Sequence, residues 1–269
     1  MHLSSLHLYP LKSAAGVAVD TLEIEPRGPR HDRRWLAVDA DGRFITARQV
    51  PAMVLVGAGI TGDKLHLSAP DMPGLEIAPP MSDAARMPVS IWKDTVDALR
   101  VDPVADAWLS VYLQQPARLV YMDDRARRAV DADYAQPGDE VSFADGYPLL
   151  VISQTALDAL NLRLADAGRT PVAMAQFRPN LVIADAAAHA EDDWTRVRIG
   201  EVAFDAVKCC RRCVFTTVDP ISGVCRDDGE PLNMLKDYRR TSAGIVFGMN
   251  LIPRGTGTLR IGDAAVVLA

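Results

Sequence analysis

Short stretches of alternating apolar and polar residues dominate the first 100 residues. Val17 to Ile24 alternates in this way, which is typical of a half-buried strand. Trp35–Val38 and Arg43–Thr46 flank Asp39-Ala40-Asp41-Gly42. Because Asp-Gly readily adopts the positive φ angles of a tight turn, these segments predict a hairpin. Further strands are predicted at 54–56, 64–67, 89–92 and 96–99, with a proline-rich loop at 70–88. Strands of this length and spacing predict a barrel or a sandwich.

The middle of the chain contains the predicted helices. Pro103–Leu113 has helical spacing, with proline at the first turn. The polar stretch 123–140 is expected to be a surface loop, and Pro148–Ile152 a buried strand. The next helix has Leu157, Leu160 and Leu164 as its apolar stripe and ends at Gly168.

Ser153 is the expected N-cap of that helix. The free N–H groups of a helix N-terminus attract anions, so Ser153 and Gln154 are candidates for anion binding. A capped scaffold helix without a ligand is the plainer interpretation.

Strands return in the last third. They are predicted at 181–183, in a hairpin at 197–204 around Gly200-Glu201, and in a closing hairpin at 257–268. A short helix is expected at 231–238. The whole pattern predicts a mixed α+β, β-rich fold with few helices.

Composition narrows the class of protein. Apolar residues make up 49% of the chain and charged residues 24%, an ordinary balance for a soluble globular protein. The net charge of -6 argues against nucleic-acid binding, which needs a basic face. The start of the chain lacks the pattern of a signal peptide, and no apolar run approaches the ~20 residues of a membrane span. We therefore expect a cytoplasmic protein, without membrane association, in which cysteines stay reduced.

All four cysteines lie between positions 209 and 225, which indicates one chemical site rather than a disulfide framework. Cys210 and Cys213 form a CxxC pair around Arg211 and Arg212. Such a pair can bind metal, cycle as a dithiol, or supply one reactive thiolate, which nearby guanidinium groups would favour. The arginines would also attract an anionic ligand.

Two of these alternatives have less support. A structural zinc site commonly uses two separated ligand pairs, and here the second pair is missing. A thioredoxin-like dithiol begins a helix, whereas Val214–Val218 is expected to continue as a strand. Cys209 and Cys225 are expected to be small packing residues.

Other basic residues lie beside turn signals and suggest an anion site. They are Lys12 in Tyr9-Pro10-Leu11-Lys12-Ser13, Arg33 in Asp32-Arg33-Arg34-Trp35, Arg48 in Thr46-Ala47-Arg48-Gln49, and Arg178 in Phe177-Arg178-Pro179-Asn180. Individually each is as consistent with a solvated surface charge, because sequence spacing does not show that they converge.

The chain resembles the MOSC proteins, named for the C-terminal domain of molybdenum cofactor sulfurases. The resemblance is carried by the four basic segments just named and by Glu191–Trp194, Cys210–Cys213, Thr216–Pro220 and Phe247–Asn250. The similar proteins include the bacterial YcbX-like proteins and the eukaryotic mitochondrial amidoxime-reducing component. The resemblance covers nearly the whole chain. It implies an N-terminal MOSC-associated β-barrel-like domain at 1–100 and a MOSC β-barrel domain at 101–269, with the cofactor in the cleft between them.

The resemblance also implies molybdenum bound to molybdopterin, with Cys213 as the thiolate ligand of the metal. The cofactor contacts that carry over are Lys12, Ser13, Arg33, Arg178, Asn180, Arg211 and Arg212, and less firmly Asn250, Ser153 and Gln154. Bidentate arginines suit an anionic phosphate, and a soft thiolate suits molybdenum.

The implied activity is reduction of the N–O bond of small N-hydroxylated compounds. Asp219 is a candidate proton relay, although Asp219–Gly223 is also good turn chemistry. No further cysteine cluster for an iron–sulfur centre is present in this chain, so electrons are expected from a separate donor protein of the ferredoxin, flavin or cytochrome type. A non-catalytic module that carries molybdopterin or sulfur is the alternative.

Overall fold

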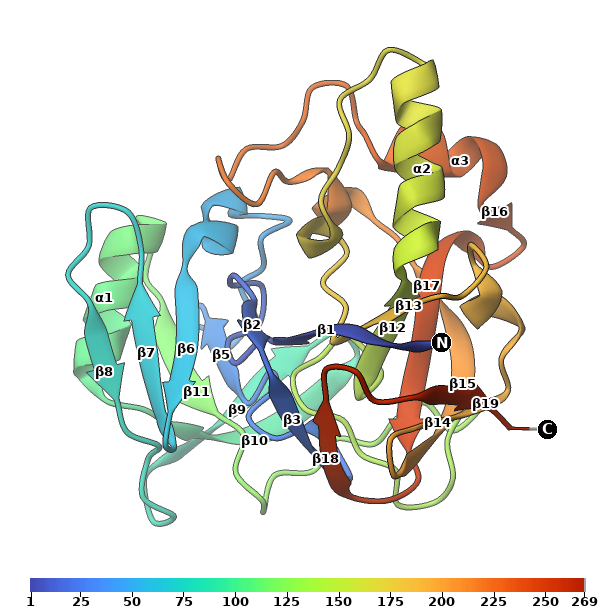
Figure 1. Ribbon diagram of the computed structural model, residues 1–269. Helices are drawn as coiled ribbons and strands as arrows, with labels where there is room; N and C mark the ends of the chain where they lie inside the picture. Colours follow the sequence, from blue (N-terminus) through green and yellow to red (C-terminus); the bar gives the residue numbers. More distant parts are fainter. Residues whose placement is uncertain (269) are drawn as a thin grey trace.

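Two lobes make up the computed structural model, which describes residues 1–268 (Figure 1). The first lobe contains a four-stranded sheet in the order β5-β11-β10-β9 and a three-stranded sheet in the order β6-β7-β8. The strands of the four-stranded sheet are β5 (Trp35–Val38), β9 (Arg86–Ile91), β10 (Asp94–Arg100) and β11 (Arg118–Tyr121). The other sheet has β6 (Gly57–Thr61), β7 (Lys64–Ser68) and β8 (Leu75–Ile77). Helix α1 (Pro103–Leu113) and the 3-10 helix η1 (Pro51–Leu55) complete the lobe.

The second lobe is built on a nine-stranded sheet in the order β19-β14-β15-β17-β12-β13-β1-β2, with β16 beside β17. Its strands are β1 (His2–Leu8), β2 (Val17–Val19), β12 (Leu149–Ser153), β13 (Leu181–Ala184), β14 (Arg196–Ile199), β15 (Val202–Arg211), β16 (Arg240–Thr241), β17 (Gly244–Pro253) and β19 (Ala265–Val267). A small sheet of β3 (Thr21–Glu25), β4 (Gly28–Pro29) and β18 (Gly257–Arg260) adjoins it. The helical segments are α2 (Gln154–Asp166), α3 (Leu232–Tyr238), η2 (Met174–Gln176), η3 (Ala190–Asp193) and η4 (Val214–Thr217).

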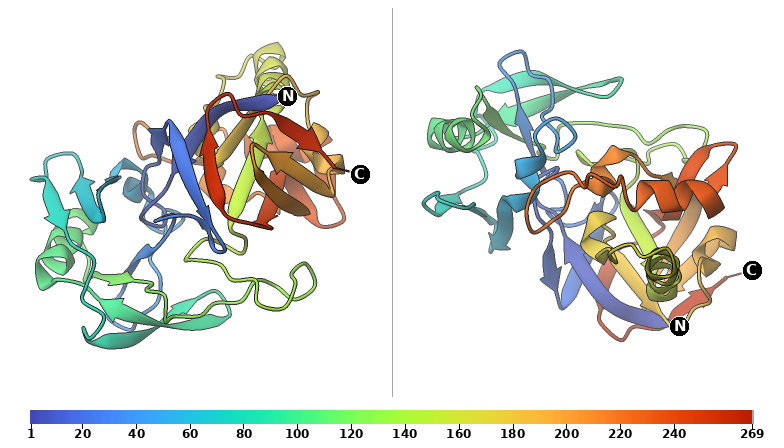
Figure 2. Two further views of the ribbon diagram at one scale, coloured as in Figure 1. Left: turned by 60° about the horizontal axis from the view of Figure 1, so that its bottom comes forward. Right: turned by 90° about the horizontal axis from the view of Figure 1, so that it is seen from above.

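The chain crosses between the lobes more than once. Strand β1, at the start of the chain, pairs with β13 of the second lobe. Residues 35–121 form the first lobe without a break, since β11 near their end pairs with β5 and β10, and the chain then passes back to the second lobe at β12. In the structure the first lobe therefore extends past the boundary expected after residue 100. Figure 2 shows the two lobes from two further directions, with the first three strands running between them.

The core of the second lobe follows from the alternation along its strands. Leu3 and Leu6 of β1 are fully buried and pack with Leu181 and Ile183 of β13. Because successive side chains of a strand point to opposite faces, the alternate residues of these strands lie on the other face of the sheet. The second face of the same sheet is covered by α2, whose Leu157, Leu160 and Leu164 pack in a separate cluster.

The β-rich α+β class predicted from the sequence is confirmed. Helix α1 has the predicted bounds, with Asp102 accepting a hydrogen bond from the Val104 N–H at 2.8 Å as its N-cap. The strands predicted at 64–67, 89–92, 96–99 and 181–183 are present, as is the short helix near 231–238.

Several local predictions are wrong. Residues 54–56 overlap η1, because Pro51 at its first turn starts a 3-10 helix, and the loop predicted at 70–88 contains β8 and the start of β9. The hairpin predicted at 35–46 forms in part: its turn is present and the Asp39 and Ile45 N–H groups donate to the carbonyls of Arg43 and Ala37, but segment 43–46 makes only isolated bridges and is not a regular strand. The closing hairpin does not form: β18 pairs with β3, and β19 pairs with β14. Each of these strands finds its partner in another part of the chain, which local turn signals do not encode.

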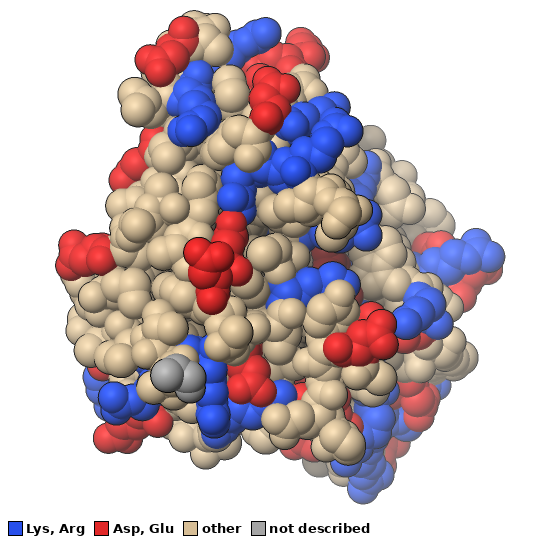
Figure 3. Space-filling view, turned by 90° about the vertical axis from the view of Figure 1, so that its right-hand side faces the viewer, with Lys and Arg blue, Asp and Glu red and all other residues tan. Residues whose placement is uncertain are grey.

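Acidic and basic side chains are interspersed on the side of the molecule that carries α3, β16 and β19 (Figure 3). Ion pairs in this part of the chain join Arg239, at the end of α3, to Asp192 of η3, and Arg196 of β14 to Asp205 of β15 at 3.6 Å. This face therefore lacks a continuous field of one sign. Over residues 1–268, the helices fall short of the length and apolar character that a bilayer crossing requires.

Leu6→Ala should lower the free energy of unfolding by about 3 kcal/mol, because it leaves a cavity in the fully buried interface of β1 and β13. Leu162→Ala is the matched control, since Leu162 is 62% exposed on α2 and its loss should cost less than about 0.5 kcal/mol. Urea unfolding followed by circular dichroism measures both. Equal effects would mean that β1 does not contribute to the core as described.

Candidate functional site

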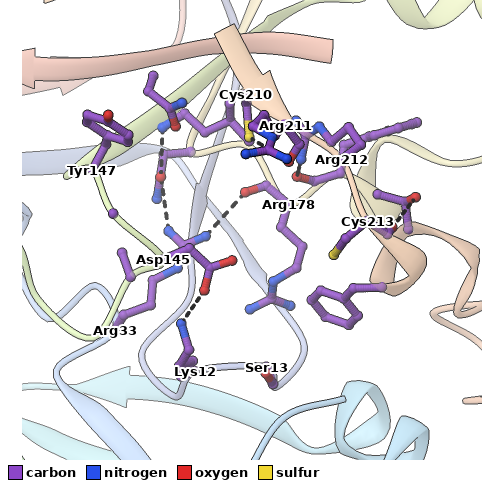
Figure 4. Close-up of a pocket in the computed structure, with 18 of the residues that line it drawn as sticks. Lys12, Ser13, Arg33, Asp145, Tyr147, Arg178, Cys210, Arg211, Arg212 and Cys213 are labelled. Carbon is purple, nitrogen blue, oxygen red and sulfur yellow. Dashed lines mark hydrogen bonds and ion pairs between the residues drawn. The ribbon is translucent and has the colours of Figure 1, made fainter. Parts of the chain in front are cut away.

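A pocket of about 830 Å³ lies where the two lobes meet. Its lining comes from the first 50 residues, from the loop before β12, and from the segments around β13, β15 and η4. Figure 4 shows these side chains around a common space. The predicted site residues that line it are Lys12, Ser13, Arg33, Arg178, Asn180, Arg211, Arg212, Cys213 and Asn250.

Three of these residues have a left-handed backbone. The φ angles are 68° at Ser13, 48° at Arg33 and 57° at Arg178. Non-glycine residues rarely adopt this conformation, which costs about 1 kcal/mol or more at each position. Such strain persists only where surrounding contacts over-determine it, and it concentrates at functional sites. The turns that place these side chains are therefore held by their surroundings.

Asp32 supplies part of that restraint. Its carboxylate, only 1% exposed, accepts hydrogen bonds from the Tyr9 N–H, the Asn180 side-chain amide at 3.0 Å, and Arg33 at 2.5 Å. Burial raises the pKa of Asp32, although Arg33 opposes the rise. Asn180 also accepts from the Leu150 N–H and donates to the His7 carbonyl. Its amide is therefore committed to joining segments around the pocket.

An aromatic ring separates two of the arginines. The Tyr9 ring lies 4.2 Å from the Arg33 guanidinium carbon and 4.3 Å from that of Arg178. Guanidinium groups stack favourably on aromatic faces, so the ring tolerates both cations. Burial and the neighbouring Arg33 lower the pKa of Arg178 to about 10. Burial, the larger cause, and the neighbouring Arg33 both disfavour the charged form of the Arg178 guanidinium.

Lys12 forms an ion pair with Asp145 in the lining of the pocket. Its ammonium donates to Asp145 at 2.5 Å and to the Phe143 carbonyl at 2.8 Å, while Arg48 contacts Asp145 at 3.3 Å. Burial lowers the pKa of Lys12 to about 8 despite the attraction of Asp145. Desolvation disfavours the Asp145 carboxylate, but Lys12, Arg48 and Arg33 outweigh it and hold its pKa well below the usual range.

Strand β15 places two neighbouring cysteines on opposite sides. Cys209 faces the second-lobe core and lies 3.9 Å from Asp192, whereas Cys210 lines the pocket. Adjacent residues of a strand point to opposite faces, so the two thiols cannot bind one metal. The register of β15 against β17 shifts between Cys209 and Arg211, a local irregularity of the kind common beside active sites. Burial raises the pKa of Cys210, with Arg212 opposing.

Cys213 lies just past the end of β15 with its thiol exposed at the pocket. The expected strand at 214–218 is wrong, because η4 begins immediately after Cys213. The Thr216 N–H and hydroxyl both donate to the Cys213 carbonyl at 3.0 Å, which fixes the backbone. The Gln176 amide in turn donates to the Thr216 carbonyl at 2.9 Å. The main chain is thus held while the sulfur faces the pocket.

The two arginines between the cysteines, Arg211 and Arg212, differ in their exposure and in their hydrogen bonds. Arg212 donates to the carbonyls of Phe247 and Phe177, so part of its guanidinium braces β17 against the segment before β13. Arg211 is exposed, close to Gly244. Asn250, on β17, donates to the Lys208 carbonyl at 2.8 Å.

Three predicted site residues do not join the pocket. Ser153 is fully buried and its N–H donates to Glu191 at 3.0 Å, so a carboxylate of the protein already occupies this helix N-terminus. The Gln154 amide contacts Asp158 on the exposed side of α2. The Asp219 carboxylate accepts from the N–H groups of Ile221 and Ser222, which is a turn role and lowers its pKa. None of the three therefore belongs to the lining of the pocket.

The sequence prediction missed Asp145 and Gln176, and treated Arg48 only as one of several basic residues. All three line the pocket. Asp145-Gly146 before Pro148 is a turn signal directly ahead of a buried strand, and that signal could have marked Asp145. Nothing in the local sequence marks Gln176.

The lining holds six basic side chains, Lys12, Arg33, Arg48, Arg178, Arg211 and Arg212, and a single carboxylate, Asp145. Such an excess of cations beside an exposed thiol fits an anionic ligand that also carries a metal able to bind a thiolate. A metal-loaded molybdopterin has both features, because its phosphate is anionic and its sulfur atoms hold the metal. Over residues 1–268, no three His, Cys, Asp or Glu side chains converge to hold a metal ion by themselves, so the zinc interpretation has no ligand set.

Comparison with known proteins finds two family domains in the chain. Residues 1–116 match the MOSC N-terminal beta barrel domain, and residues 138–266 match the MOSC domain. The chain is 34% identical to mitochondrial amidoxime-reducing component 1 of Xenopus laevis, over 97% of this chain and 80% of that protein. It is also 34% identical to the Homo sapiens protein of the same name, over 99% of this chain and 82% of that protein.

The prediction of a cytoplasmic protein is contradicted by these relatives, whose names are mitochondrial. The resemblance seen in the sequence is confirmed, since both domains are matched in order and the identity extends over nearly the full length. The chain therefore belongs to the MOSC-domain family that contains the mitochondrial amidoxime-reducing components.

Proposed function

We propose that this protein is an oxidoreductase that reduces the N–O bond of N-hydroxylated compounds at a molybdopterin-bound molybdenum. The observation that carries the proposal is the exposed Cys213 thiol at a pocket with a large excess of basic side chains. The names of the relatives supply the substrate class, because an amidoxime is an N-hydroxylated amidine.

The residues divide into two roles. Cys213 would be the thiolate ligand of the metal, held in place through its carbonyl by Thr216. Lys12, Ser13, Arg33, Arg178, Arg211 and Arg212 would hold the anionic groups of the pterin. Because Arg33, Arg178 and Arg212 also bind backbone carbonyls, they are oriented before any ligand arrives. Preorganised cations lower the entropic cost of binding.

The bound cofactor would supply the two-electron redox chemistry, and the protein would orient it and control access. Conversion of an N-hydroxyl group to N–H with release of water consumes two electrons and two protons. Among residues 1–268, no group of three His, Cys, Asp or Glu side chains could hold a further metal ion. The electrons would therefore come from a separate donor protein.

Metal and pterin analysis tests the cofactor, using protein produced in a host that makes molybdopterin. We expect molybdenum and pterin in equal amounts, and reduction of an amidoxime with reduced methyl viologen as the electron source. Folded protein that contains neither would overturn the proposal. Cofactor without turnover would favour a carrier of molybdopterin instead.

Cys213→Ala should lower amidoxime reduction by at least about 100-fold, because loss of a direct ligand should exceed the 10- to 100-fold effects of outer-shell changes. Cys225→Ala is the matched control: Cys225 is exposed and does not line the pocket. It should retain nearly full activity. The measurement is steady-state reduction at equal pterin content, and the opposite pattern would refute the choice of ligand.

Lys12→Met should weaken pterin retention about tenfold or more, the worth of one charge-assisted hydrogen bond. The wild-type protein should also lose affinity as the pH rises through about 8, since Lys12 of the free protein becomes neutral there and anion binding then requires proton uptake. Pterin fluorescence after dialysis at a series of pH values measures both effects.

Lys236→Met, which removes an exposed lysine of α3, provides the control and should retain pterin like the wild type. If the Lys12 variant retained pterin equally well, or if it kept the same pH dependence, Lys12 would have no part in binding the anion.

A further inference from the structure

Asp145 is the one acidic side chain in the lining of the pocket over residues 1–268, and the proposed function gives it no role. Its two carboxylate oxygens serve different cations. One accepts from the Lys12 ammonium at 2.5 Å, and the other accepts from Arg48 at 3.3 Å. Figure 4 shows Asp145 reaching into the pocket, where a dashed line joins its carboxylate to Lys12. The carboxylate therefore occupies a position in which two cations could instead hold an anionic group of a ligand.

The main chain that carries Asp145 is fixed from behind, whereas its side chain is not enclosed. The buried Arg128 guanidinium donates to the carbonyls of Ser142, Ala144 and Asp145. The Asp145 side chain is 63% exposed, and a Cβ at the following Gly146 would meet no atom within 4 Å. Exposed side chains change rotamer within picoseconds to nanoseconds. The carboxylate can therefore turn toward solvent while the main chain stays in place.

The two cations have supports that do not depend on Asp145. The Lys12 ammonium also donates to the Phe143 carbonyl at 2.8 Å. The Arg48 guanidinium carbon lies 4.4 Å from the ring of Trp92, whose φ angle of 54° is left-handed. A non-glycine residue keeps such a conformation only where its surroundings over-determine it, so Trp92 is a firm support for Arg48. Both cations therefore stay in the lining when the carboxylate turns away.

The balance of charge favours a phosphate in place of the carboxylate. The Asp145 carboxylate neutralises only one of the two cations. A phosphate monoester carries nearly two negative charges at neutral pH and has three strong acceptor oxygens. Among residues 1–268 the buried Nε of Arg48 has no hydrogen-bond partner, so this arginine has a donor to spare. A phosphate would thus neutralise both Lys12 and Arg48, and the displaced Asp145 would be hydrated.

We propose that Asp145 is a built-in competitor for the anion of the ligand: in the free protein it neutralises Lys12 and Arg48, and the phosphate of the ligand displaces it. The contact is autoinhibitory, because only molecules whose carboxylate has turned away can bind phosphate through both cations. A carboxylate that occupies the cations about nine-tenths of the time lowers the apparent affinity about tenfold. This inference rests on the proposed function and adds to it a device that sets how tightly the cofactor is held.

Asp145→Asn tests the competition, because it keeps the shape of the side chain and removes the charge. Calorimetric titration with inorganic phosphate, on the full chain produced in a host that makes no molybdopterin, should show about tenfold tighter binding than to wild type. Asp97→Asn is the matched control. Asp97 is also 63% exposed, pairs with Arg86 at 2.7 Å and lies outside the lining of the pocket, so its replacement should leave the phosphate affinity at the wild-type value. Equal or weaker binding to Asp145→Asn would overturn the inference, since Asp145 would then position the cations without competing.

Arg48→Met gives a second readout that does not depend on the folding of Asp145→Asn. It removes one of the two cations and leaves Asp145 on Lys12, so phosphate should bind at least about tenfold more weakly than to wild type, the worth of one charge-assisted hydrogen bond. Unchanged phosphate binding by Arg48→Met would also overturn the inference. Protein that lacks pterin when a competent host produces it would overturn the proposed function alone, because phosphate binding by the cofactor-free chain would still decide the role of Asp145.

Discussion

A buried carboxylate, Asp32, joins the turns on which the candidate site is built. It binds the Tyr9 backbone, the Asn180 amide and the Arg33 guanidinium, and Asn180 extends the network to His7 and Leu150. Because an ionised carboxylate is costly to bury, its environment must supply several charge-assisted hydrogen bonds. Those bonds fix the segment before β5 against β12 and β13, and with them the mutual position of the arginines.

That network makes possible a pocket that would otherwise be unfavourable. Arg33 and Arg178 both contact the Tyr9 ring, and burial together with Arg33 lowers the pKa of Arg178. Asp145 pairs with Lys12 and Arg48, and Asp32 pairs with Arg33, whereas Arg178, Arg211 and Arg212 make no ion pair with a carboxylate among residues 1–268. The lining therefore keeps an excess of positive charge, which is the electrostatic basis of the proposed anion site.

The same scaffold separates thiols that are neighbours in sequence. Alternation along β15 turns Cys209 into the core and Cys210 to the pocket, and the end of the strand leaves Cys213 exposed. The short η4 turn then brings Phe215 into the lining of the same pocket. One stretch of chain thus contributes both the candidate metal ligand and part of the apolar surface beside it.

The sequence by itself determined the β-rich class, helix α1, the strands with clear alternation, and the family through its ordered motifs, because these depend on local periodicity and residue identity. Only the tertiary structure decided that β18 and β19 pair with distant strands, that Ser153 faces Glu191, and that Asp145, Arg48 and Gln176 join the pocket. These partners are distant along the chain: Ser153 and Glu191 are 38 residues apart, β19 and β14 about 70, and β18 and β3 more than 200. Their contacts are set by packing and by hydrogen bonds that no local pattern records.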